Sequence, residues 1–443
     1  MDFYIKKEEI VKSLNATLGV VEKRQTLPIL SNVLFEVDES TLKLTATDLE
    51  SEISTISTIS NFKSGGRTTA PAKKLSELCR LFKDDSEIHF YLDGDNLKIE
   101  TDSGKYNLST LPSDDFPIFE KEEGGNVVNI SAQNLKAIIT KTSFAMGNQD
   151  WRHYLNGLYL SVEDTVITSV ATDAHRLALA NAALNEGISE NITGIVPRKS
   201  INEIGKIVSE YSENILLQLS ANSINVSVSG TSFASKLIEG KFPDYEQVIP
   251  SGESSTLTID KKTLSESLSR VSVLSSEKFR GIRIVTSKDS VNISANNPEK
   301  EQAEESITCS YSGEDIDIAF NVNYIQEILS SIDSENVGLA LDITGFSNPN
   351  AGGVGNGPVN DVIAVLQTLY PANTKNGAIA TVHCTNYAGA SINISQGLLS
   401  GALNKSYIAV DKDNVASSTS VMQDLAVDAA GVSGSATITP TRY

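Results

Sequence analysis

Cysteine, histidine and long apolar runs are all scarce in this chain of 443 residues. The three cysteines, Cys79, Cys309 and Cys384, lie far apart and form no Cys-x-x-Cys pair. They indicate neither a disulfide framework nor a zinc site, and a reducing cytosol is the expected compartment. The N-terminal residues MDFYIKKEEI lack the apolar core of a signal peptide. No run of about 18 apolar residues occurs, so we expect a cytoplasmic protein with no membrane partner.

Motifs for catalysis are also lacking. The chain has 4 histidines and no His-Glu-x-x-His pair. The glycine-rich residues 352–357 are not followed by the Lys-Ser/Thr pair of a phosphate-binding loop. No nucleophile elbow has partners at a known spacing. We therefore expect no enzyme activity and no cofactor.

Basic residues are outnumbered by acidic ones, 36 to 56, which gives a net charge of −20. Phosphates attract a protein through Lys and Arg, so a strongly acidic chain is usually a poor ligand for nucleic acid. Binding to DNA would require the basic residues to be gathered on one face.

What the chain does contain is one unit used three times. The middle copy reads LNGLYLSVEDTVITSVATDAHRL over residues 155–177, with counterparts at Leu30–Leu49 and Phe279–Pro298. Asn32 and Asn156 are 124 positions apart, and so are Gly157 and Gly281. A fixed period of this length is the mark of a repeat architecture.

Each unit is predicted to hold a helix, a strand pair, a second helix and further strands. In the first unit, Ile10 and Leu14 recur at helical spacing, and Pro71 opens the second helix. In the second unit, Pro197 follows Pro71 by 126 residues. In the third unit, Asp260 is the expected N-cap of the first helix. The strands expected in the first unit are Val33–Val37, Thr41–Ala46, Glu87–Leu92, Leu97–Thr101 and Tyr106–Leu111.

The repeat pattern ends near Asn350. Residues 351–357, AGGVGNG, are typical of a flexible joint, and no Glu follows them. The distance from second helix to final strand is 34 residues in the first unit (Pro71 to Lys105) and 114 in the third (Val322 to Ala436), so 114 − 34 = 80 residues are extra. We therefore predict repeats at 1–125, 126–252 and 253–350, an insertion at 351–435 and a possible last strand at 436–443.

The expected last strand, Ala436–Tyr443, would pair beside Val337–Ile343. A foreign tail that replaced this strand is the open alternative. Within the extra segment, Val362–Leu369 is predicted as a short helix and Ala378–Val382 as a strand. No motif indicates its role, so it could be a small interaction domain or a segment joined from another protein.

The repeated units resemble the bacterial DNA polymerase III β subunit family, the sliding clamps, over Met1–Pro349. The resemblance implies an α+β fold of three tandem clamp repeats, with helices inside and antiparallel sheets outside a ring that two copies close head to tail. The segments that carry the resemblance are RQTLPIL at 24–30, YLNG at 154–157, ATDAHRL at 171–177, FPDY at 242–245, EKFRG at 277–281 and ANNP at 295–298.

Such a ring reconciles an acidic chain with duplex DNA if its basic residues face inward. Contacts would be to phosphate without base reading, because a clamp must slide. The alternative is that these side chains are simply solvated on polar helix faces. The DNA-binding residues that the resemblance implies are Arg24, Lys73, Lys74, Lys136, Gln149, Arg152, Tyr154, Arg198 and Lys199.

The partners implied by the resemblance are the polymerase III α subunit, the clamp loader and other proteins with a clamp-binding motif. They insert a short peptide with apolar ends into a pocket between units two and three. As a lone histidine, His175 is expected to pack rather than to catalyse. The pocket residues are Leu155, Thr172, Ala174, His175, Arg176, Leu177, Pro243, Val248, Pro440 and Arg442.

Four positions depart from the family pattern. Ala174 stands where Gly is usual, and Gln247 replaces a common Arg. Thr439 and Thr441 replace two Met residues, which supply more adaptable apolar contact. A clamp-fold scaffold with impaired loading or partner binding is therefore the alternative function.

Closing the ring requires two unlike edges. One edge is expected at Lys74, Tyr106 and Leu108. The other is expected at the end of the third unit's first helix, with three glutamates available to meet Lys74. The alternative for these glutamates is an exposed acidic loop. The second edge comprises Val273, Leu274, Glu299, Glu301 and Glu305.

Overall fold

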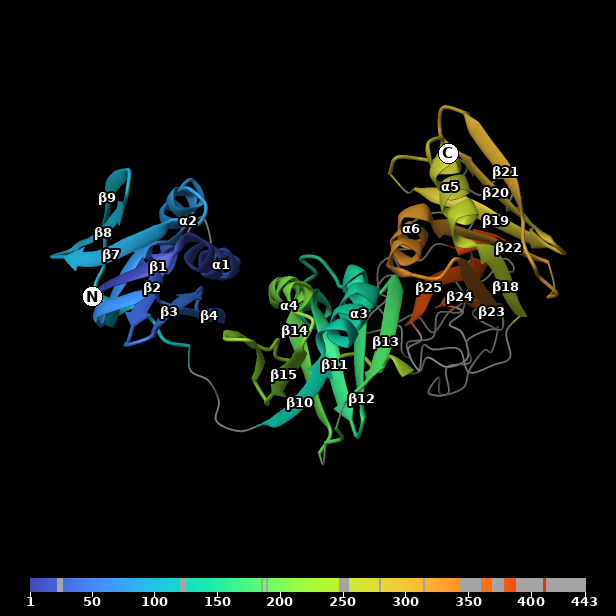
Figure 1. Ribbon diagram of the computed structural model, residues 1–443. Helices are drawn as coiled ribbons and strands as arrows, with labels where there is room; N and C mark the ends of the chain where they lie inside the picture. The colour runs from blue at the N-terminus through green and yellow to red at the C-terminus, as the bar shows by residue number, and fades with distance from the viewer. Residues whose placement is uncertain are drawn as a thin grey trace. The chain divides into compact units, whose positions relative to one another are not determined.

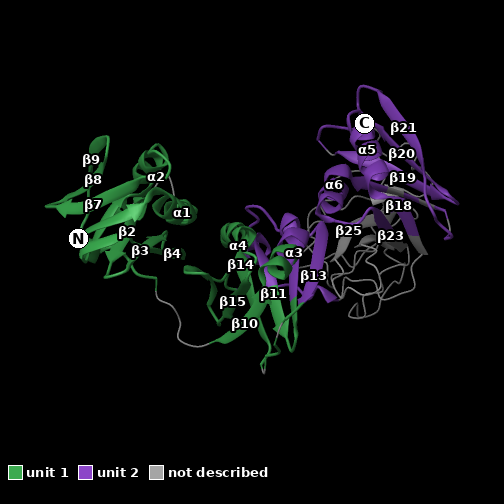
Figure 2. Cartoon of the chain, in the orientation of Figure 1, with its two compact units in different colours: residues 1–137, 160–167, 183–239 green, residues 138–159, 168–182, 240–443 purple. Residues whose placement is uncertain are grey.

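The computed structural model describes residues 1–21, 27–119, 125–184, 186–188, 190–246, 255–278, 280–313 and 315–342, and three later strands (Figure 1). By contacts the chain divides into two compact units (Figure 2). Unit 1 comprises Met1–Ala137, Leu160–Ile167 and Ala183–Glu239, and unit 2 comprises the remainder. The division passes through the second repeat.

The first repeat begins with a strand that the sequence did not predict, followed by the predicted amphipathic helix. Glu8 and Glu9 lie in the first turn of that helix, where the helix dipole favours them, and Ile10 and Leu14 are fully buried. The elements are β1 (Asp2–Lys6), α1 (Lys7–Thr17), β2 (Asn32–Val37), β3 (Thr41–Thr47), β4 (Ser51–Thr58), β5 (Asn61–Ser64), β6 (Gly66–Pro71), α2 (Ala72–Arg80), β7 (Glu87–Asp93), β8 (Asn96–Thr101) and β9 (Gly104–Ser109).

The described residues of the second repeat follow the same order of elements, except that one strand, β14, stands where the first repeat has β5 and β6. Pro197 directly precedes its second helix, as Pro71 does in the first repeat. The elements are β10 (Asn126–Ser131), α3 (Ala132–Thr142), β11 (Gly157–Glu163), β12 (Val166–Thr172), β13 (Arg176–Ala183), β14 (Ile192–Pro197), α4 (Arg198–Glu210), β15 (Asn214–Leu219), β16 (Ser223–Val228) and β17 (Thr231–Lys236).

The third repeat confirms the predicted N-cap: the Asp260 carboxylate accepts a hydrogen bond of 2.7 Å from the backbone N–H of Thr263. The elements are β18 (Ser255–Asp260), α5 (Lys261–Ser272), β19 (Gly281–Ser287), β20 (Ser290–Asn296), β21 (Gln302–Thr308), β22 (Ile316–Asn321), α6 (Val322–Ser331) and β23 (Asn336–Asp342).

One sheet in unit 1 joins the first two repeats. Its strand order is β10-β15-β16-β17-β4-β3-β2-β6, and β17 pairs antiparallel with β4 from Thr231 opposite Thr55 to Ser235 opposite Ser51. A second sheet of unit 1, β5-β1-β7-β8-β9, ends at β9. The core between these sheets and the helices α1 and α2 includes Phe3, Phe35 and Phe90.

Unit 2 contains the core of the third repeat. Helices α5 and α6 contribute Leu264, Leu268, Ile325 and Ile328, and the strands of the sheet β21-β20-β19-β22 contribute apolar side chains such as Ile293. Burial of this one-sided apolar set is the main favourable term in the folding of the repeat.

The segment after residue 350 corrects one prediction and confirms another. Val362–Leu369 is not a helix: β24 (Asn360–Thr368) pairs antiparallel with β23. The predicted strand at Ala378–Val382 is confirmed as part of β25 (Ala378–Tyr387), which pairs with β24 on one side and β13 on the other. A third short strand, β26 (Ala409–Asp411), pairs parallel with β25.

The expected pairing of Ala436–Tyr443 beside Val337–Ile343 is also wrong. A strand has only two edges, and those of β23 are taken by β18 and β24. Residues 436–443 lie outside the described residues. β25 pairs with β13 in the same way as β17 pairs with β4. The strand that joins the third repeat to the second is therefore β25, which ends at Tyr387, about 50 residues before the predicted last strand begins at Ala436.

Candidate functional sites

The turn between β12 and β13 carries the residues predicted to bind partner peptides. The Thr172 hydroxyl donates to the Arg176 carbonyl at 2.6 Å and accepts from the Ala174 N–H at 3.0 Å. The Asp173 carboxylate accepts from the N–H groups of His175 and Arg176 at 2.9 and 3.0 Å. These bonds fix the turn, in which Ala174 has a φ of 72°, a left-handed conformation.

Arg176 is buried and held by several groups of unit 2. Its guanidinium donates to the Asp173 carboxylate at 3.1 Å, to the Phe144 carbonyl at 2.8 Å and to Glu327 on α6. It also lies 4.7 Å from the ring centroid of Tyr324 and 5.4 Å from that of Phe144. The side chain therefore ties the turn of the second repeat to the second helix of the third.

The other predicted pocket residues differ in how much they expose. Four of them are buried: Leu155, Thr172, Ala174 and Leu177. His175 and Pro243 are partly exposed, and the His175 ring stacks on Tyr324 at 6.4 Å. Three predicted members, Val248, Pro440 and Arg442, lie outside the described residues.

Most of the predicted DNA-binding residues lie on helices or next to them. Lys73 and Lys74 are exposed in the first turn of α2, Lys136 is exposed on α3, and Arg198 and Lys199 begin α4. The first turns of α2 and α4 contain no acidic residue. Cations there oppose the helix dipole, so their placement does not serve helix stability. Arg24 lies outside the described residues.

The loop after α3 carries the remaining predicted DNA-binding residues. Gln149 is exposed with a φ of 56°, and Tyr154 is half-buried. Arg152 donates to the Asp150 carboxylate at 3.0 and 2.8 Å. This hydrogen bond raises the pKa of Arg152 and lowers that of Asp150. Lys199 is likewise paired, with the Asp48 carboxylate at 2.5 Å.

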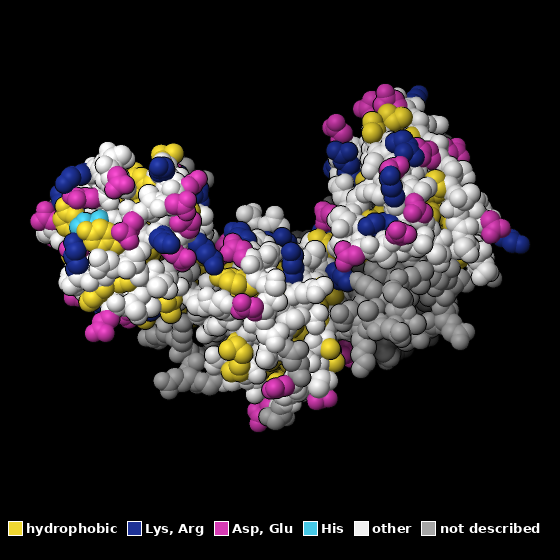
Figure 3. Space-filling model, viewed as in Figure 1, with side chains coloured by type: hydrophobic (Ala, Val, Ile, Leu, Met, Phe, Trp, Pro, Cys, Tyr) yellow, Lys and Arg dark blue, Asp and Glu magenta, His cyan; other side chains and the backbone are white. Residues whose placement is uncertain are grey.

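Sequence reasoning missed one exposed cation of the same kind. Lys262 lies in the first turn of α5, which contains no acidic residue. Its side chain is 82% exposed and reaches Glu266 only at 3.9 Å. Comparing the first turns of all helices in the sequence would have found it. On the visible face of the molecule, Lys and Arg are interspersed with Asp and Glu (Figure 3).

The predicted ring-closing edges include two end strands, β9 and β21. In unit 1, β9 ends its sheet, and Tyr106, 37% exposed, packs its ring 5.3 Å from Phe82. In unit 2, β21 ends its sheet. Val273, at the end of α5, is 74% exposed and Leu274 is half-buried. In unit 1, Leu108 on β9 is half-buried.

The three glutamates of the second edge are not equivalent. Glu305 accepts two hydrogen bonds from Arg270, at 2.6 and 2.7 Å. This ion pair lowers the pKa of Glu305 to about 2, so its carboxylate is already engaged within the chain. Glu301 accepts from the Asn297 amide at 2.6 Å, and Glu299 is exposed.

The described part of the chain lacks two features of other protein classes. No group of three or more His, Cys, Asp or Glu side chains there is arranged to hold a metal ion. In the same residues, no helix has the length and apolar character that a membrane crossing requires.

Comparison with known proteins assigns each repeat. Residues 1–120, 129–244 and 246–349 match the models of the N-terminal, central and C-terminal domains of the DNA polymerase III beta subunit. The beta sliding clamps of Pseudomonas aeruginosa and Vibrio cholerae are 40% and 38% identical over 341 residues, which is 77% of this chain and 93% of each relative.

A solved structure agrees. The crystal structure of the DNA polymerase III subunit beta from Pseudomonas aeruginosa superposes with a TM-score of 0.78 at 36% identity, covering 86% of this chain and 99% of that one. The fold and the three matched domains thus define a clamp protein. The chain belongs to the DNA polymerase III beta subunit family. It is a DNA sliding clamp, a non-catalytic processivity factor of DNA polymerase III.

Proposed function

We propose that two copies of this chain close head to tail into a ring around duplex DNA and tether the replicative polymerase in the cytoplasm. The observation that carries the ring is the pair of unlike end strands, β9 and β21. An unpaired strand edge is a template for pairing with another chain. Because the two edges differ, they favour a head-to-tail contact that joins unlike surfaces.

Charge placement supports the contact with DNA. The exposed Lys73, Lys74, Lys136 and Lys262 lie on helices of all three repeats. Such side chains attract phosphate without reading bases. Retention would come from encirclement rather than from affinity.

The ring is tested by changing an edge residue without disturbing the fold. Val273→Asp places a charge at a side chain that is 74% exposed, so the protomer keeps its fold. We expect the dimer dissociation constant to rise at least roughly tenfold, since apolar contact is lost and a charge is buried. Leu274→Ala should act in the same direction. Ile56→Asp, at a side chain 54% exposed inside the eight-stranded sheet, is the matched control.

Analytical ultracentrifugation at nanomolar protein is the measurement. If Val273→Asp and Leu274→Ala both leave the dimer as intact as Ile56→Asp does, the proposed edge is wrong.

The partners in this proposal are the polymerase III α subunit, the clamp loader and other clamp-binding proteins. Their docking surface includes the turn Thr172–Leu177, whose hydrogen bonds pre-form a binding surface at low entropic cost. His175 and Pro243 are its more exposed members.

The role proposed for Pro440 and Arg442 calls for a truncation that keeps the sheet. Ending the chain after Tyr387 preserves β24 and β25. We expect a labelled clamp-binding peptide to bind the truncated chain more weakly than the full chain, as measured by fluorescence anisotropy. We also expect His175→Ala in the full chain to weaken the binding of this peptide. Equal affinity of the full and truncated chains would remove Pro440 and Arg442 from the site.

A further inference from the structure

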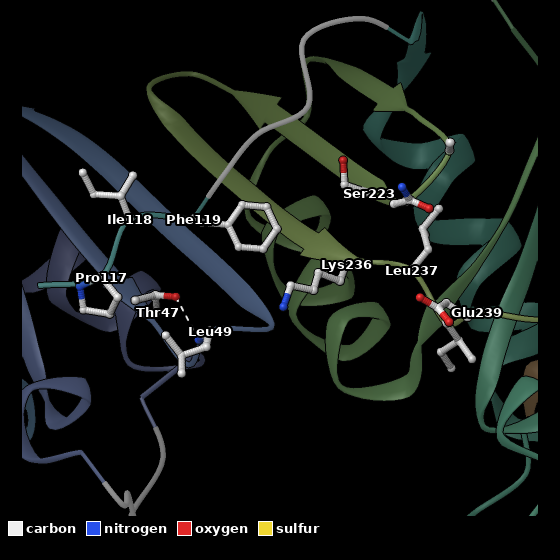
Figure 4. A pocket seen from close by; sticks show the side chains of 12 residues that line it. Thr47, Leu49, Pro117, Ile118, Phe119, Ser223, Lys236, Leu237 and Glu239 are labelled. Atoms are coloured by element: carbon white, nitrogen blue, oxygen red, sulfur yellow. Dashed lines mark hydrogen bonds between the residues drawn. The ribbon is translucent and has the colours of Figure 1, made fainter.

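Unit 1 contains a cavity of about 580 Å³ where the first two repeats join (Figure 4). Its walls come from the turn after β3, from Pro117–Phe119, from the turn Ala221–Ser223 and from Lys236–Glu239 at the end of β17. The volume lies within the range of cavities that hold small ligands or a few side chains. All of these residues belong to one compact unit.

The turn after β3 is built as the turn Thr172–Leu177 is built. The Thr47 hydroxyl donates to the Ser51 carbonyl at 2.8 Å and accepts from the Leu49 N–H at 3.1 Å. The Asp48 carboxylate accepts from the N–H groups of Glu50 and Ser51 at 3.0 and 2.6 Å. Leu49 has a φ of 77°, against 72° for Ala174. The same hydrogen-bond scheme therefore occurs once in each of the first two repeats.

The neighbouring strands and loops also correspond. β17 pairs with β4 after the first turn as β25 pairs with β13 after the second. Pro117 and Pro243 lie 126 positions apart. The cavity is thus the counterpart, one repeat earlier, of the surface proposed above for partner peptides.

The side chains that line the cavity or lie beside it differ from those of that surface. Glu50 and Ser51 stand where His175 and Arg176 stand in the second repeat. Leu49 is 42% and Ile118 is 75% exposed, so apolar side chains are open to a ligand. Phe119 is buried, and its N–H donates to the Glu52 carboxylate at 3.3 Å. The wall at Phe119 is therefore fixed while Leu49 and Ile118 stay accessible.

One cation is directed into the cavity. Figure 4 shows the Lys236 ammonium pointing toward Leu49 and Phe119, whereas Glu239 lies beside Leu237 at the other end. Lys236 is 3.2 Å from Glu50, and both side chains are more than half exposed. Exposed ion pairs of this kind contribute little and exchange readily, so a ligand carboxylate can replace Glu50 beside the ammonium.

We propose that this cavity is a second peptide-binding site of the clamp. Its occupant is a short linear segment of a partner protein in which a carboxylate lies between two apolar side chains. The apolar side chains contact Leu49 and Ile118, and the carboxylate pairs with Lys236. This site is separate from the turn Thr172–Leu177, and it does not require peptide binding there.

The test uses the full chain labelled with ¹³C at its Leu and Ile methyl groups. The probes are peptides acetyl-Gly-Xaa-Asp-Zaa-Gly-amide, in which Xaa and Zaa are Leu, Ile or Phe, and matched peptides with Lys in place of Asp. We expect at least one Asp peptide to shift the methyl signals of Leu49 and Ile118 in a saturable manner, and its Lys counterpart to bind more weakly.

Two variants locate the effect. Ile118→Asp should weaken that peptide about tenfold, through lost apolar contact and charge repulsion. Lys236→Met should weaken it about threefold, as expected for an exposed ion pair. Ile56→Asp, outside the cavity, should leave binding unchanged. The proposal is overturned if no Asp peptide shifts Leu49 and Ile118, or if neither cavity variant weakens binding.

The same spectra separate this site from the proposed partner surface. Shifts at Leu155 and Leu177 alone would overturn the second site and leave the partner surface standing. Shifts at Leu49 and Ile118 alone would support the second site and give no support to the partner surface for these peptides.

Discussion

At the scale of single residues, Arg176 shows how a predicted pocket residue is also held by contacts within the fold. The sequence places it in the turn with His175, but it cannot reveal Glu327, which is 151 residues away and accepts from its guanidinium. Burial to 7% exposure leaves little of Arg176 for a ligand. Without the Arg176 side chain, the carboxylates of Asp173 and Glu327 would lose their hydrogen-bond donor. The unpaired charge would destabilise the packing of α6 against the turn.

Ala174 yields a prediction about stability. Its φ of 72° is costly for a residue with a Cβ atom. In Ala174→Gly the lost strain outweighs the added entropy of the unfolded chain, so we expect unfolding to require roughly 0.5–1 kcal/mol more free energy. Urea denaturation measures this difference. Ala178→Gly, at a buried position inside β13, should have the opposite sign, and a loss of stability in Ala174→Gly would contradict the account.

At the scale of elements, the sequence was sufficient where a repeat supplied the register. The starts of α2, α4 and α5 were predicted from Pro71, Pro197 and Asp260, because capping and first-turn preferences are local. The end of the third repeat was not predictable in this way. The apolar run Val362–Leu369 fits a helix or a buried strand equally well. The open edges of β23 and β13, which only the folded sheet presents, favour strands.

Of the candidate sites, one could be predicted from the sequence and the other could not. The turn Thr172–Leu177 was found from its motif, and its hydrogen bonds follow from the Thr-Asp pair at its start. The cavity beside Leu49 was not found, because its walls come from four segments that only tertiary structure brings together.

The ion pair between α5 and β21 predicts a dependence on pH. Arg270 lowers the pKa of Glu305 from its ordinary 4.5 to about 2. A lowered pKa means that the pair stabilises the folded chain above the unfolded value, near 4.5, and that this stability is lost as pH falls toward 2.

We therefore expect the urea midpoint of the wild type to fall more steeply between pH 5 and pH 3 than that of Arg270→Gln. Glu305→Gln should resemble Arg270→Gln, since each variant removes one partner. Parallel pH profiles of the wild type and both variants would show that the pair does not couple folding to protonation.

At the scale of the whole molecule, a net charge of −20 must be reconciled with DNA. The acidic excess opposes simple adhesion to a polyanion, while cations lie in the first turns of α2, α4 and α5, where we propose local phosphate contacts. Encirclement resolves the conflict, because a closed ring is retained by topology even when each contact is weak.

The most direct test of the ring measures how long the clamp stays on DNA before and after the DNA is cut. The clamp is placed on a nicked circular plasmid with a clamp loader and ATP, and the complex is isolated by gel filtration. A sliding clamp known to load with the same loader is the control. We expect the protein to remain with the circle and to leave within the time of one column run once a restriction enzyme makes the plasmid linear. Equal retention on circular and linear DNA, or no retention on the circle when the control clamp is retained, would contradict the account.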